Sequence, residues 1–582
     1  MLLISRSRRG GGSAKNILIW IDVALNLADV NSITGAQVSK QVKVGEYLIN
    51  KLYERGVRHV FGVPGDYALG FFKELEKSRL ELINTSDEQG AGFAADAYAR
   101  VKGLGVVCIT YGVGGLKVAN TTAQAFAEKS PVVVISGAPG LKERTKNPLL
   151  HHKVREFDTQ YKVFRELTMD SALIDDPETA APEIDRVLDS AVKYKRPVYI
   201  EIPRDMVSLP VKPYKARRPE AAGSETETLE EAIGEVVAII NKSRKPVIIA
   251  GVEIHRFGLQ DRLLELLGKT NIPLATTILG KSVISETHPL CMGVYEGAMG
   301  REAVRQYVES SDCMILLGTF MTDVNLGIYT ANIDRAHSIC ATSEGIAIRH
   351  HAYEEVSIHD FMDGLLKGGI KRRKNARIPN PPLPKRPKPV KGKKISVSYL
   401  FKTLNSCLGE KTVVIADPGD AMLGALDMVI QMETEFLCPA YYCSLGFAVP
   451  ASLGVQMARP DLRPLVLVGD GAFQMTGMEL STIARFGQNP IVVVFNNEGY
   501  GTERPMLDGT FNDIHPWRHS RIPGVLNKGV GFDVHTEDEL QEALATAIKD
   551  TKNFYILDVH LDKADRSEAH KRLTTALSER VR

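Results

Sequence analysis

Two short polar motifs, each following an apolar run, carry the residue types needed to bind a diphosphate and a metal ion. Leu465 to Val468 leads into Gly469-Asp470-Gly471, and a second apolar run leads into Asn496-Asn497-Glu498-Gly499. Glycines allow a tight turn and close approach of the backbone to phosphate oxygens, and a helix that begins there adds free N–H groups. Mg²⁺ prefers oxygen ligands and shares them with phosphates, so an aspartate, an asparagine and a backbone carbonyl suit a diphosphate with Mg²⁺.

Together, the two motifs resemble the thiamine diphosphate (ThDP) binding motif. The resemblance implies that Gly469, Asp470 and Gly471 bind the cofactor, and that Asp470, Asn497 and the carbonyl of Gly499 hold Mg²⁺. It extends through nearly the whole chain from Val44, in domain order as well as in motif. Gly-Asp-Gly alone is a common turn, so the prediction depends on the two motifs together.

The resemblance also implies residues at the opposite end of the cofactor. Glu88 matches the glutamate that activates the aminopyrimidine ring, and the following Ala-Ala-Asp-x-Tyr-Ala-Arg pattern supports this alignment. Without the resemblance, Glu88 is an acid favoured at a helix start, and Asp87 is its alternative. Leu445 matches the apolar side chain that bends the cofactor, the carbonyl of Cys443 is expected to accept from its 4′-amino group, and Gly419 is a further expected contact.

Four acid–base residues resemble the quartet of the 2-oxo-acid decarboxylases, which include pyruvate, indolepyruvate and phenylpyruvate decarboxylases. They are Asp66, His151, His152 and Glu503. The resemblance implies that Glu503 acts near the substrate carboxylate and then donates a proton, while Asp66 and the histidines relay protons to the product. Histidine suits a relay because its unperturbed pKa lies near 6.5. A second doublet, His350-His351, lacks this context and shows that the doublet alone is weak evidence.

Substitutions around the expected reacting centre indicate a substrate larger than pyruvate. Thr502 stands where a branched aliphatic residue is usual in pyruvate-preferring relatives, and Pro418 and Met422 replace what resembles a Thr and a Trp. Met506 and Tyr295 are expected to line the same space. We therefore expect non-oxidative decarboxylation of an aromatic or long-chain 2-oxo acid, such as phenylpyruvate or indolepyruvate.

Several alternative functions remain open at this stage. The nearest are a pyruvate decarboxylase and an acetolactate-synthase-like carboligase, although the latter would lack the His doublet. A nucleotide-dependent dehydrogenase is disfavoured because Gly112-Val113-Gly114-Gly115 lacks the G-x-G-x-x-G pattern. A non-catalytic protein on the same fold is disfavoured by the intact acid–base residues.

The elements that must position these residues are short β-branched runs followed by helical patterns, which predict an α/β fold of three doubly wound parallel-sheet domains. The expected segments are an N-terminal arm (1–43), a pyrimidine-binding domain (44–218), a middle domain (219–369), a basic Pro-rich linker (370–395) and a diphosphate- and Mg-binding domain (396–582). The predicted strands are His59 to Val63, Val106 to Thr110, Val132 to Ser136, Val198 to Ile202, Pro246 to Gly251, Cys313 to Gly318, Ser338 to Ala341, Val413 to Ala416, Leu465 to Val468, Ile491 to Phe495 and Tyr555 to Val559. One helix is predicted over Gly90 to Lys102.

The amino-acid composition is that of an ordinary folded protein, and the charge distribution argues against a nucleic-acid partner. The 582 residues are 44% hydrophobic and 24% charged, with a formal net charge of +2. Lys371 to Lys394 holds eleven basic and no acidic residues, so the remainder of the chain carries a formal net charge of −9. An acidic remainder does not suggest a nucleic-acid surface. The six prolines in that segment predict an extended, solvated connector rather than a helix.

Location and assembly are predicted from the cysteines, from two segments of the chain and from the resemblance. The seven scattered cysteines suggest a reducing compartment and a cytoplasmic protein. The basic N-terminal arm is read as a loose extension rather than a transit peptide. The uncharged stretch Phe436 to Ala458 is read as a buried loop and helix rather than a membrane span, because it contains two prolines and several polar residues. The resemblance implies a homodimer at minimum, with a homotetramer expected.

Overall fold

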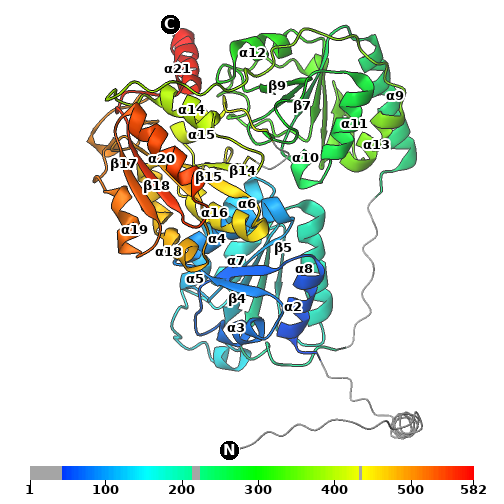
Figure 1. Cartoon of the computed structure of the whole chain (residues 1–582). Helices are drawn as coiled ribbons and strands as arrows, with labels where there is room; N and C mark the ends of the chain where they lie inside the picture. Colours follow the sequence, from blue (N-terminus) through cyan, green and yellow to red (C-terminus); the bar gives the residue numbers. More distant parts are fainter. Residues whose placement is uncertain (1–41, 213–222, 432–435, 582) are drawn as a thin grey trace, which may run out of the picture.

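Three α/β domains follow one another along the chain in the computed structural model, which describes residues 42–212, 223–431 and 436–581 (Figure 1). The domain coloured blue to cyan comes first, the green domain second and the yellow-to-red domain third. The predicted N-terminal arm lies almost wholly outside the described residues.

The first domain has a six-stranded parallel sheet in the order β2-β1-β3-β4-β6-β5. Its strands are β1 (His59–Gly62), β2 (Glu81–Asn84), β3 (Gly105–Ile109), β4 (Val132–Ala138), β5 (Asp170–Leu173) and β6 (Val198–Pro203). Its helices are α2 (Val44–Glu54), α3 (Leu69–Glu76), α4 (Glu88–Lys102), α5 (Val113–Lys117), α6 (Ala119–Ala127), η1 (Leu141–Arg144), α7 (Thr159–Leu167) and α8 (Ala180–Tyr194). Every residue of the central strands β3 and β4 is buried, so both faces of the sheet are covered there, as expected for a parallel sheet.

The middle domain has a seven-stranded sheet in the order β13-β12-β11-β10-β7-β8-β9. Its strands are β7 (Pro246–Ala250), β8 (Leu274–Thr276), β9 (Cys291–Val294), β10 (Cys313–Leu317), β11 (Ser338–Thr342), β12 (Gly345–Ile348) and β13 (His351–Tyr353). Its helices are α9 (Thr226–Lys242), α10 (Glu253–Arg256), α11 (Gln260–Thr270), α12 (Glu302–Glu309), η2 (Arg335–His337) and α13 (Ile358–Lys367). The sheet is not wholly parallel, because β12 pairs antiparallel with both β11 and β13. Connections this short can join only antiparallel strands.

The third domain has a five-stranded parallel sheet in the order β14-β15-β16-β18-β17. Its strands are β14 (Thr412–Ala416), β15 (Arg463–Gly469), β16 (Ile491–Asn496), β17 (Val530–Val534) and β18 (Tyr555–His560). Its helices are α14 (Val397–Asn405), α15 (Asp420–Ala425), α16 (Ala448–Ala458), α17 (Asp470–Thr476), η3 (Gly477–Glu479), α18 (Leu480–Arg485), η4 (Thr510–Asn512), η5 (His519–Arg521), α19 (Ile522–Val525), α20 (Glu537–Lys549) and α21 (Glu568–Val581). The predicted α/β fold class is confirmed.

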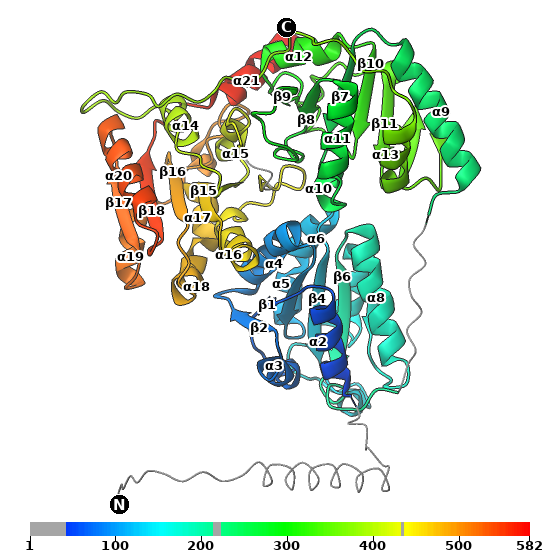
Figure 2. The ribbon, with the colours of Figure 1, turned by 45° about the vertical axis from the view of Figure 1, so that its right-hand side comes forward.

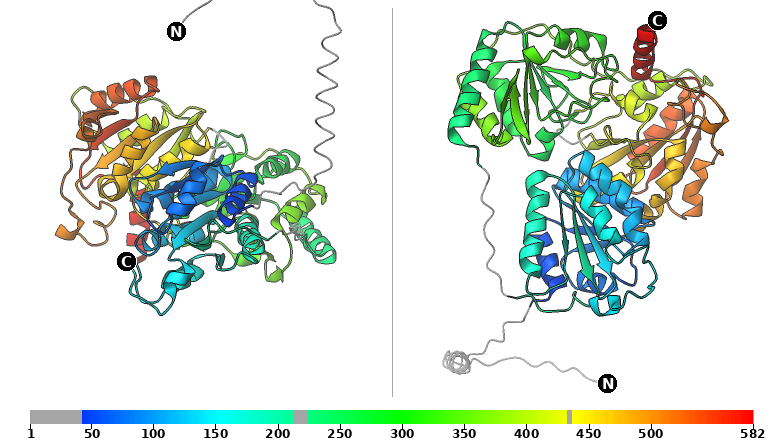
Figure 3. Two further views of the ribbon diagram at one scale, coloured as in Figure 1. Left: turned by 90° about the horizontal axis from the view of Figure 1, so that it is seen from below. Right: turned by 180° about the vertical axis from the view of Figure 1, so that it is seen from behind.

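Helices α4 and α16 join the first domain to the third. They lie against each other in Figures 1 and 2, and their buried residues belong to a single core. A Cβ on Gly454 of α16 would stand 2.0 Å from the carbonyl oxygen of Ala94 in α4, so only glycine permits this approach. Figure 3 shows from behind that the first domain lies below the other two.

The basic segment 371–394 runs without helix or strand and is mostly exposed, as its prolines and charges indicate. It is nevertheless anchored to both domains that it joins. Arg373 donates to the carbonyl of Ser243 at 3.0 Å, and Arg386 donates to Gln541 at 2.6 Å. The backbone N–H of Val390 donates to Glu537. These contacts give the connector a defined path despite the mutual repulsion of its charges.

The uncharged stretch Phe436 to Ala458 forms the 11-residue α16 and a loop that is buried except around Tyr441 and Tyr442, which are exposed. Every helix within the described ranges is too short or too polar to cross a bilayer. All seven cysteines are free.

Candidate active site

The two predicted phosphate and metal motifs meet at the carboxyl edge of the third sheet. Gly469 ends β15 and pairs in register with Phe495 of β16, which places Asp470 beside the turn that contains Asn497. The Asp470 carboxylate accepts from the backbone N–H of Gly471 at 2.8 Å and of Gly499 at 3.2 Å. It therefore connects the two turns directly.

The environment of Asp470 suits a metal ligand. The side chain is 1% exposed, and burial raises its pKa to about 6, against the opposing effects of backbone N–H groups and His519. A buried carboxylate of this kind is stabilised by a bound cation. The oxygens of Asp470, Asn497 and Gly499 are hard donors, and a Cβ on Gly469 would meet nothing within 4 Å, so there is space for a phosphate. The residues present fit a diphosphate with Mg²⁺.

One cavity of about 490 Å³ contains most of the predicted residues of the third domain. Those that line it are Gly419, Met422, Cys443, Leu445, Gly469, Asp470, Gly471, Asn497, Gly499, Thr502, Glu503 and Met506, together with Pro418. Its polar end is formed by the diphosphate motif, and its remaining wall is largely apolar. The structure therefore brings the predicted third-domain residues together in one cavity.

The prediction that Tyr295 lines the substrate space is wrong, because Tyr295 does not line this cavity. Its side chain is 2% exposed and packs in a core of the middle domain with Val304 and Val308. Its hydroxyl group donates to Glu309 at 3.2 Å. Tyr295 is thus a core residue whose polar atom is satisfied by a neighbouring helix.

A buried aspartate that was not predicted holds the loop carrying Cys443 and Leu445. Asp417, which follows β14, accepts from the backbone N–H groups of Gly446 at 2.8 Å and Ala448 at 2.7 Å. Cys443 itself has a φ of 57°, an unusual conformation outside glycine. Burial raises the pKa of Asp417 to about 7, although both backbone N–H groups oppose the shift. An acid directly after an apolar strand was the available sequence signal.

Glu88 and Asp87 have different structural roles at the start of α4. Asp87 is the N-cap residue and accepts from the backbone N–H of Gln89 at 2.7 Å. Glu88 forms an ion pair with Lys117 at 2.8 Å, and Asp87 is also bonded to Lys117. Because Asp87 caps the helix, Glu88 is not needed for that purpose. This favours Glu88 over Asp87 as the residue available to a cofactor.

Asp66, His151 and His152 lie together in the first domain. The Nε2 atom of His151 is 2.7 Å from an Asp66 oxygen, and the imidazole stacks on Tyr67 at 4.9 Å between ring centroids. The two histidine rings meet edge to face at 4.8 Å. Burial raises the pKa of Asp66, but the hydrogen bond and charge of His151 outweigh it, so this pKa lies below its ordinary value. The trio can hold and pass a proton.

The second doublet has none of this organisation. His350 and His351 are exposed, and His351 pairs with Glu235 of the middle domain at 3.1 Å. The context that distinguished the two doublets in the sequence is matched by their different surroundings in the fold.

Glu503 lies on the loop after β16 and lines the cavity of the third domain. Its side chain is exposed in the single chain and makes no hydrogen bond or ion pair within the described part of the protein. The groups of the first domain, namely Glu88, Asp66, His151 and His152, do not line this cavity. One chain therefore holds two separate sets of predicted site residues.

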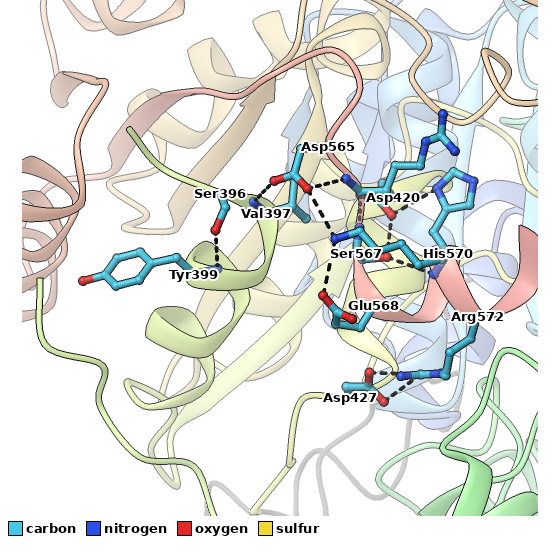
Figure 4. A network of polar contacts seen from close by, with 12 residues as sticks. Ser396, Val397, Tyr399, Asp420, Asp427, Asp565, Ser567, Glu568, His570 and Arg572 are labelled. Atoms are coloured by element: carbon cyan, nitrogen blue, oxygen red, sulfur yellow. Dashed lines mark hydrogen bonds and ion pairs between the residues drawn. The ribbon is translucent and has the colours of Figure 1, made fainter. Parts of the chain in front are cut away.

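Helix α21 forms a wall of the cavity that was not predicted. His570, Leu573, Thr574 and Leu577 line it from this helix. Figure 4 shows how α21 is attached: Asp420 accepts from the backbone N–H of Ser567 at 2.8 Å and from its hydroxyl group at 2.5 Å. Arg572 pairs with Asp427 at 3.0 Å. The contacts join residues almost 150 positions apart, which is why sequence reasoning missed them.

Comparison with protein families gives matches across all three domains. The N-terminal TPP binding domain of the thiamine pyrophosphate enzymes matches residues 42–161, the central domain matches 233–366, and the C-terminal TPP binding domain matches 421–559.

Individual relatives match over nearly the full chain. An indole-3-pyruvate decarboxylase from Azospirillum brasilense is 36% identical over 90% of this chain and 96% of its own length. An alpha-keto-acid decarboxylase from Mycolicibacterium paratuberculosis is 32% identical over 92% and 96%, respectively. Pyruvate decarboxylase 1 from Pisum sativum is 32% identical over 89% and 91%. The family resemblance inferred from the motifs is confirmed: this chain belongs to the thiamine diphosphate-dependent 2-oxo-acid decarboxylases.

Proposed function

We propose that this enzyme converts an aromatic or long-chain 2-oxo acid, such as phenylpyruvate or indolepyruvate, into an aldehyde and CO₂, with Mg²⁺ as its metal. The proposal of a large substrate depends mainly on the residues that line the cavity beside Glu503. There, Thr502, Met422 and Met506 line the cavity with apolar groups of α21. The named activity of the Azospirillum relative supports the same choice.

Each predicted site residue has a proposed role in binding the cofactor, holding the metal or transferring a proton. Asp470, Asn497 and the carbonyl of Gly499 would hold Mg²⁺ against the diphosphate, and Glu88 would bond to the pyrimidine end. When bound, ThDP supplies an electron sink for the electron pair released as CO₂ leaves. Glu503 is proposed to lie near the substrate carboxylate and then to donate a proton at the carbon that lost CO₂. Asp66, His151 and His152 are proposed to relay protons during aldehyde release.

A substrate panel tests the proposal. Purified enzyme with ThDP and Mg²⁺ is expected to release aldehyde and to show a higher kcat/KM with phenylpyruvate or indolepyruvate than with pyruvate. Met422→Trp should lower kcat/KM for the aromatic acids by about 10-fold or more while sparing pyruvate, because added bulk costs ~1–3 kcal/mol in a filled pocket. A clear preference of the wild type for pyruvate would instead select the alternative, a pyruvate decarboxylase, which the pea relative favours.

We also propose that the active site is shared between subunits, so that a homodimer is the minimum unit and a homotetramer is the expected assembly. The support is that the first-domain groups are absent from the third-domain cavity of the same chain. Subunits carrying Glu88→Gln and subunits carrying Asp470→Ala, each inactive alone, should recover part of the activity when mixed. Confirmed mixed dimers without activity would contradict the shared site.

A cytoplasmic location is proposed from the seven free cysteines, which suit a reducing compartment. Cell fractionation with compartment markers tests it, and enzyme recovered in an oxidising compartment would contradict it.

A further inference from the structure

A second group of metal-ligating side chains lies at the carboxyl edge of the third sheet, outside the active-site cavity. It consists of Asp533 at β17, His560 at the end of β18 and His535 just after β17. Strands β17 and β18 are parallel, with Val534 beside Val559, so the next residue on each strand brings His535 beside His560. Asp533 stands two residues before His535 and therefore points to the same face.

The three side chains converge on one point. The Nε2 atom of His560 is 2.7 Å from Oδ1 of Asp533, and the Nε2 atom of His535 is 3.3 Å from the same oxygen. One ligand atom from each residue lies within 4.8 Å of the other two. The imidazole rings are stacked with centroids 4.0 Å apart and planes 9° apart. Two nitrogens and one oxygen are thus presented side by side.

The backbone holds this arrangement in place. His560 pairs with Asn496 of β16 on the other side of β18, so its strand is fixed on both edges. The backbone N–H of His535 donates to Glu539 at 2.8 Å, and its carbonyl accepts from Ile395 at 3.4 Å. The residues that carry the two imidazoles are therefore tied to a sheet, to the start of α20 and to the end of the basic segment.

The arrangement of Asp533, His535 and His560 differs from that of an ordinary surface ion pair. His337 and Asp334 form such a pair in the middle domain, with one imidazole and one carboxylate at 2.9 Å. A single partner satisfies an exposed imidazole, and exposed pairs contribute little to stability. The group on the third domain instead directs two nearly parallel imidazoles at one carboxylate oxygen, with all three side chains open to solvent and to an entering ion.

We propose that Asp533, His535 and His560 bind a divalent transition-metal ion of the zinc class. Imidazole nitrogen and carboxylate oxygen suit Zn²⁺, Ni²⁺ or Co²⁺, whereas Mg²⁺ prefers oxygen ligands alone. Water can complete the coordination because the site is exposed. The ion would replace the hydrogen bonds to Asp533 and would cross-link the edge strand β17 to β18. The site is separate from the oxygen ligands proposed for Mg²⁺ at Asp470 and Asn497.

Calorimetric titration with ZnCl₂ tests the proposal on tag-free holoenzyme, with ThDP and excess Mg²⁺ present so that the diphosphate site is occupied. The wild type is expected to bind Zn²⁺, and His560→Ala and His535→Ala should each weaken one binding event by about 10- to 100-fold or more, since even an outer-shell change costs that much. His337→Ala, the matched control, should titrate like the wild type. Unchanged titrations of both variants would overturn the proposal.

A titration of His151→Ala and a set of melting temperatures show which group of residues binds the Zn²⁺ ion. Asp66, His151 and His152 form another group of similar composition. Zn²⁺ binding that is lost in His151→Ala but retained in His560→Ala would assign the ion to that group and overturn the proposal.

The melting temperature with and without ZnCl₂ provides a second readout. The wild type and His337→Ala should be stabilised, and the stabilisation should shrink in Asp533→Asn, a conservative variant that keeps the size of the side chain.

Discussion

At the scale of single residues, the proposed acid–base groups differ in how firmly the chain holds them. Asp66 and His151 are bonded to each other at 2.7 Å, and Tyr67 stacks on the imidazole. Glu503 is exposed, and its side chain makes no hydrogen bond or ion pair in the described structure. The residues of the proposed relay are therefore already organised in one chain, whereas we expect substrate or a neighbouring subunit to complete the surroundings of Glu503.

Glu503→Gln should retain cofactor binding but lose about 10²–10⁴-fold in kcat, because an amide cannot donate and accept the proton as a carboxyl group does. Aldehyde release measures the turnover, and calorimetry measures ThDP binding. Asp508→Asn, which alters an exposed acid on the same loop, serves as the control and should stay near wild-type activity. Full turnover by Glu503→Gln would remove this residue from the mechanism.

The two histidine doublets allow a matched comparison. His151→Ala removes the partner of Asp66 and should lower kcat by about 10²-fold or more. His350→Ala changes an exposed doublet of the middle domain and should leave steady-state kinetics unchanged. Equal activities in the two variants would contradict the relay.

At the scale of elements, strand ends and one C-terminal helix build the cavity. Asp417, Asp470 and Asn497 directly follow the ends of β14, β15 and β16, and Asp470 also begins α17. Helix α21 closes the apolar side, and Asp420 at the start of α15 accepts two hydrogen bonds from Ser567 (Figure 4). His570 of α21 also lies 3.4 Å from Asp420. Helix α21 is thus docked through Asp420 at its start and through the Arg572–Asp427 pair one turn later.

Asp420→Ala should loosen α21, since removal of a charged acceptor from two donors costs about 1–3 kcal/mol. We expect amide hydrogen exchange in residues 568–579 to accelerate by about 10-fold or more and kcat/KM to fall with it. Glu568→Gln breaks only an exposed pair on the same helix and should leave exchange unchanged. Wild-type exchange rates in Asp420→Ala would show that other contacts dock α21.

At the scale of the whole molecule, buried charges join the domains. Arg100 of the first domain pairs with Asp96 at 2.9 Å and Glu128 at 2.8 Å, and it donates to the carbonyl of Cys438 in the third domain. Glu128 also accepts from the backbone N–H groups of Tyr441 and Tyr442. Removal of one partner from such a network leaves an uncompensated charge, so the domains resist separation.

Buried acids also make stability depend on pH. Burial raises the pKa of Glu201 from 4.5 to about 7, against the opposing effects of Tyr199 and Arg144. The folded protein then holds a proton that the unfolded chain releases, so this contribution to the free energy of unfolding is present below about pH 4.5 and is lost as pH rises to about 7.

Glu201→Gln should therefore reduce the fall in stability between pH 5 and pH 7.5 by roughly 1–3 kcal/mol. Urea unfolding at both pH values measures the difference. Asp417, with a pKa of about 7, should preserve part of the slope. Glu178→Gln, a change in an exposed pair with Lys212, is the control. Identical slopes for the wild type and Glu201→Gln would refute the assignment.

Much of the fold could be predicted from sequence, because strongly apolar runs and the turns after them are local patterns. Every predicted strand corresponds to an observed strand within a few residues, and the predicted helix is α4. The missed strands are short or half-exposed. Among them is β17, whose sequence Val-Gly-Phe-Asp-Val is only partly buried and becomes a strand by pairing with β18. Its extended form depends on a neighbour rather than on its own pattern.

The sequence by itself determined the diphosphate motif, because the glycines, Asp470 and Asn497 owe their positions to the strands that directly precede them. It also determined the family, through the combined acid–base residues. Tertiary structure alone decided that Tyr295 belongs to a core, that Asp417 holds the loop carrying Cys443 and Leu445, and that α21 closes the cavity. It also decided that His535 meets His560. The physical reason is that these contacts join residues that are distant along the chain, and packing rather than local spacing determines which of them meet.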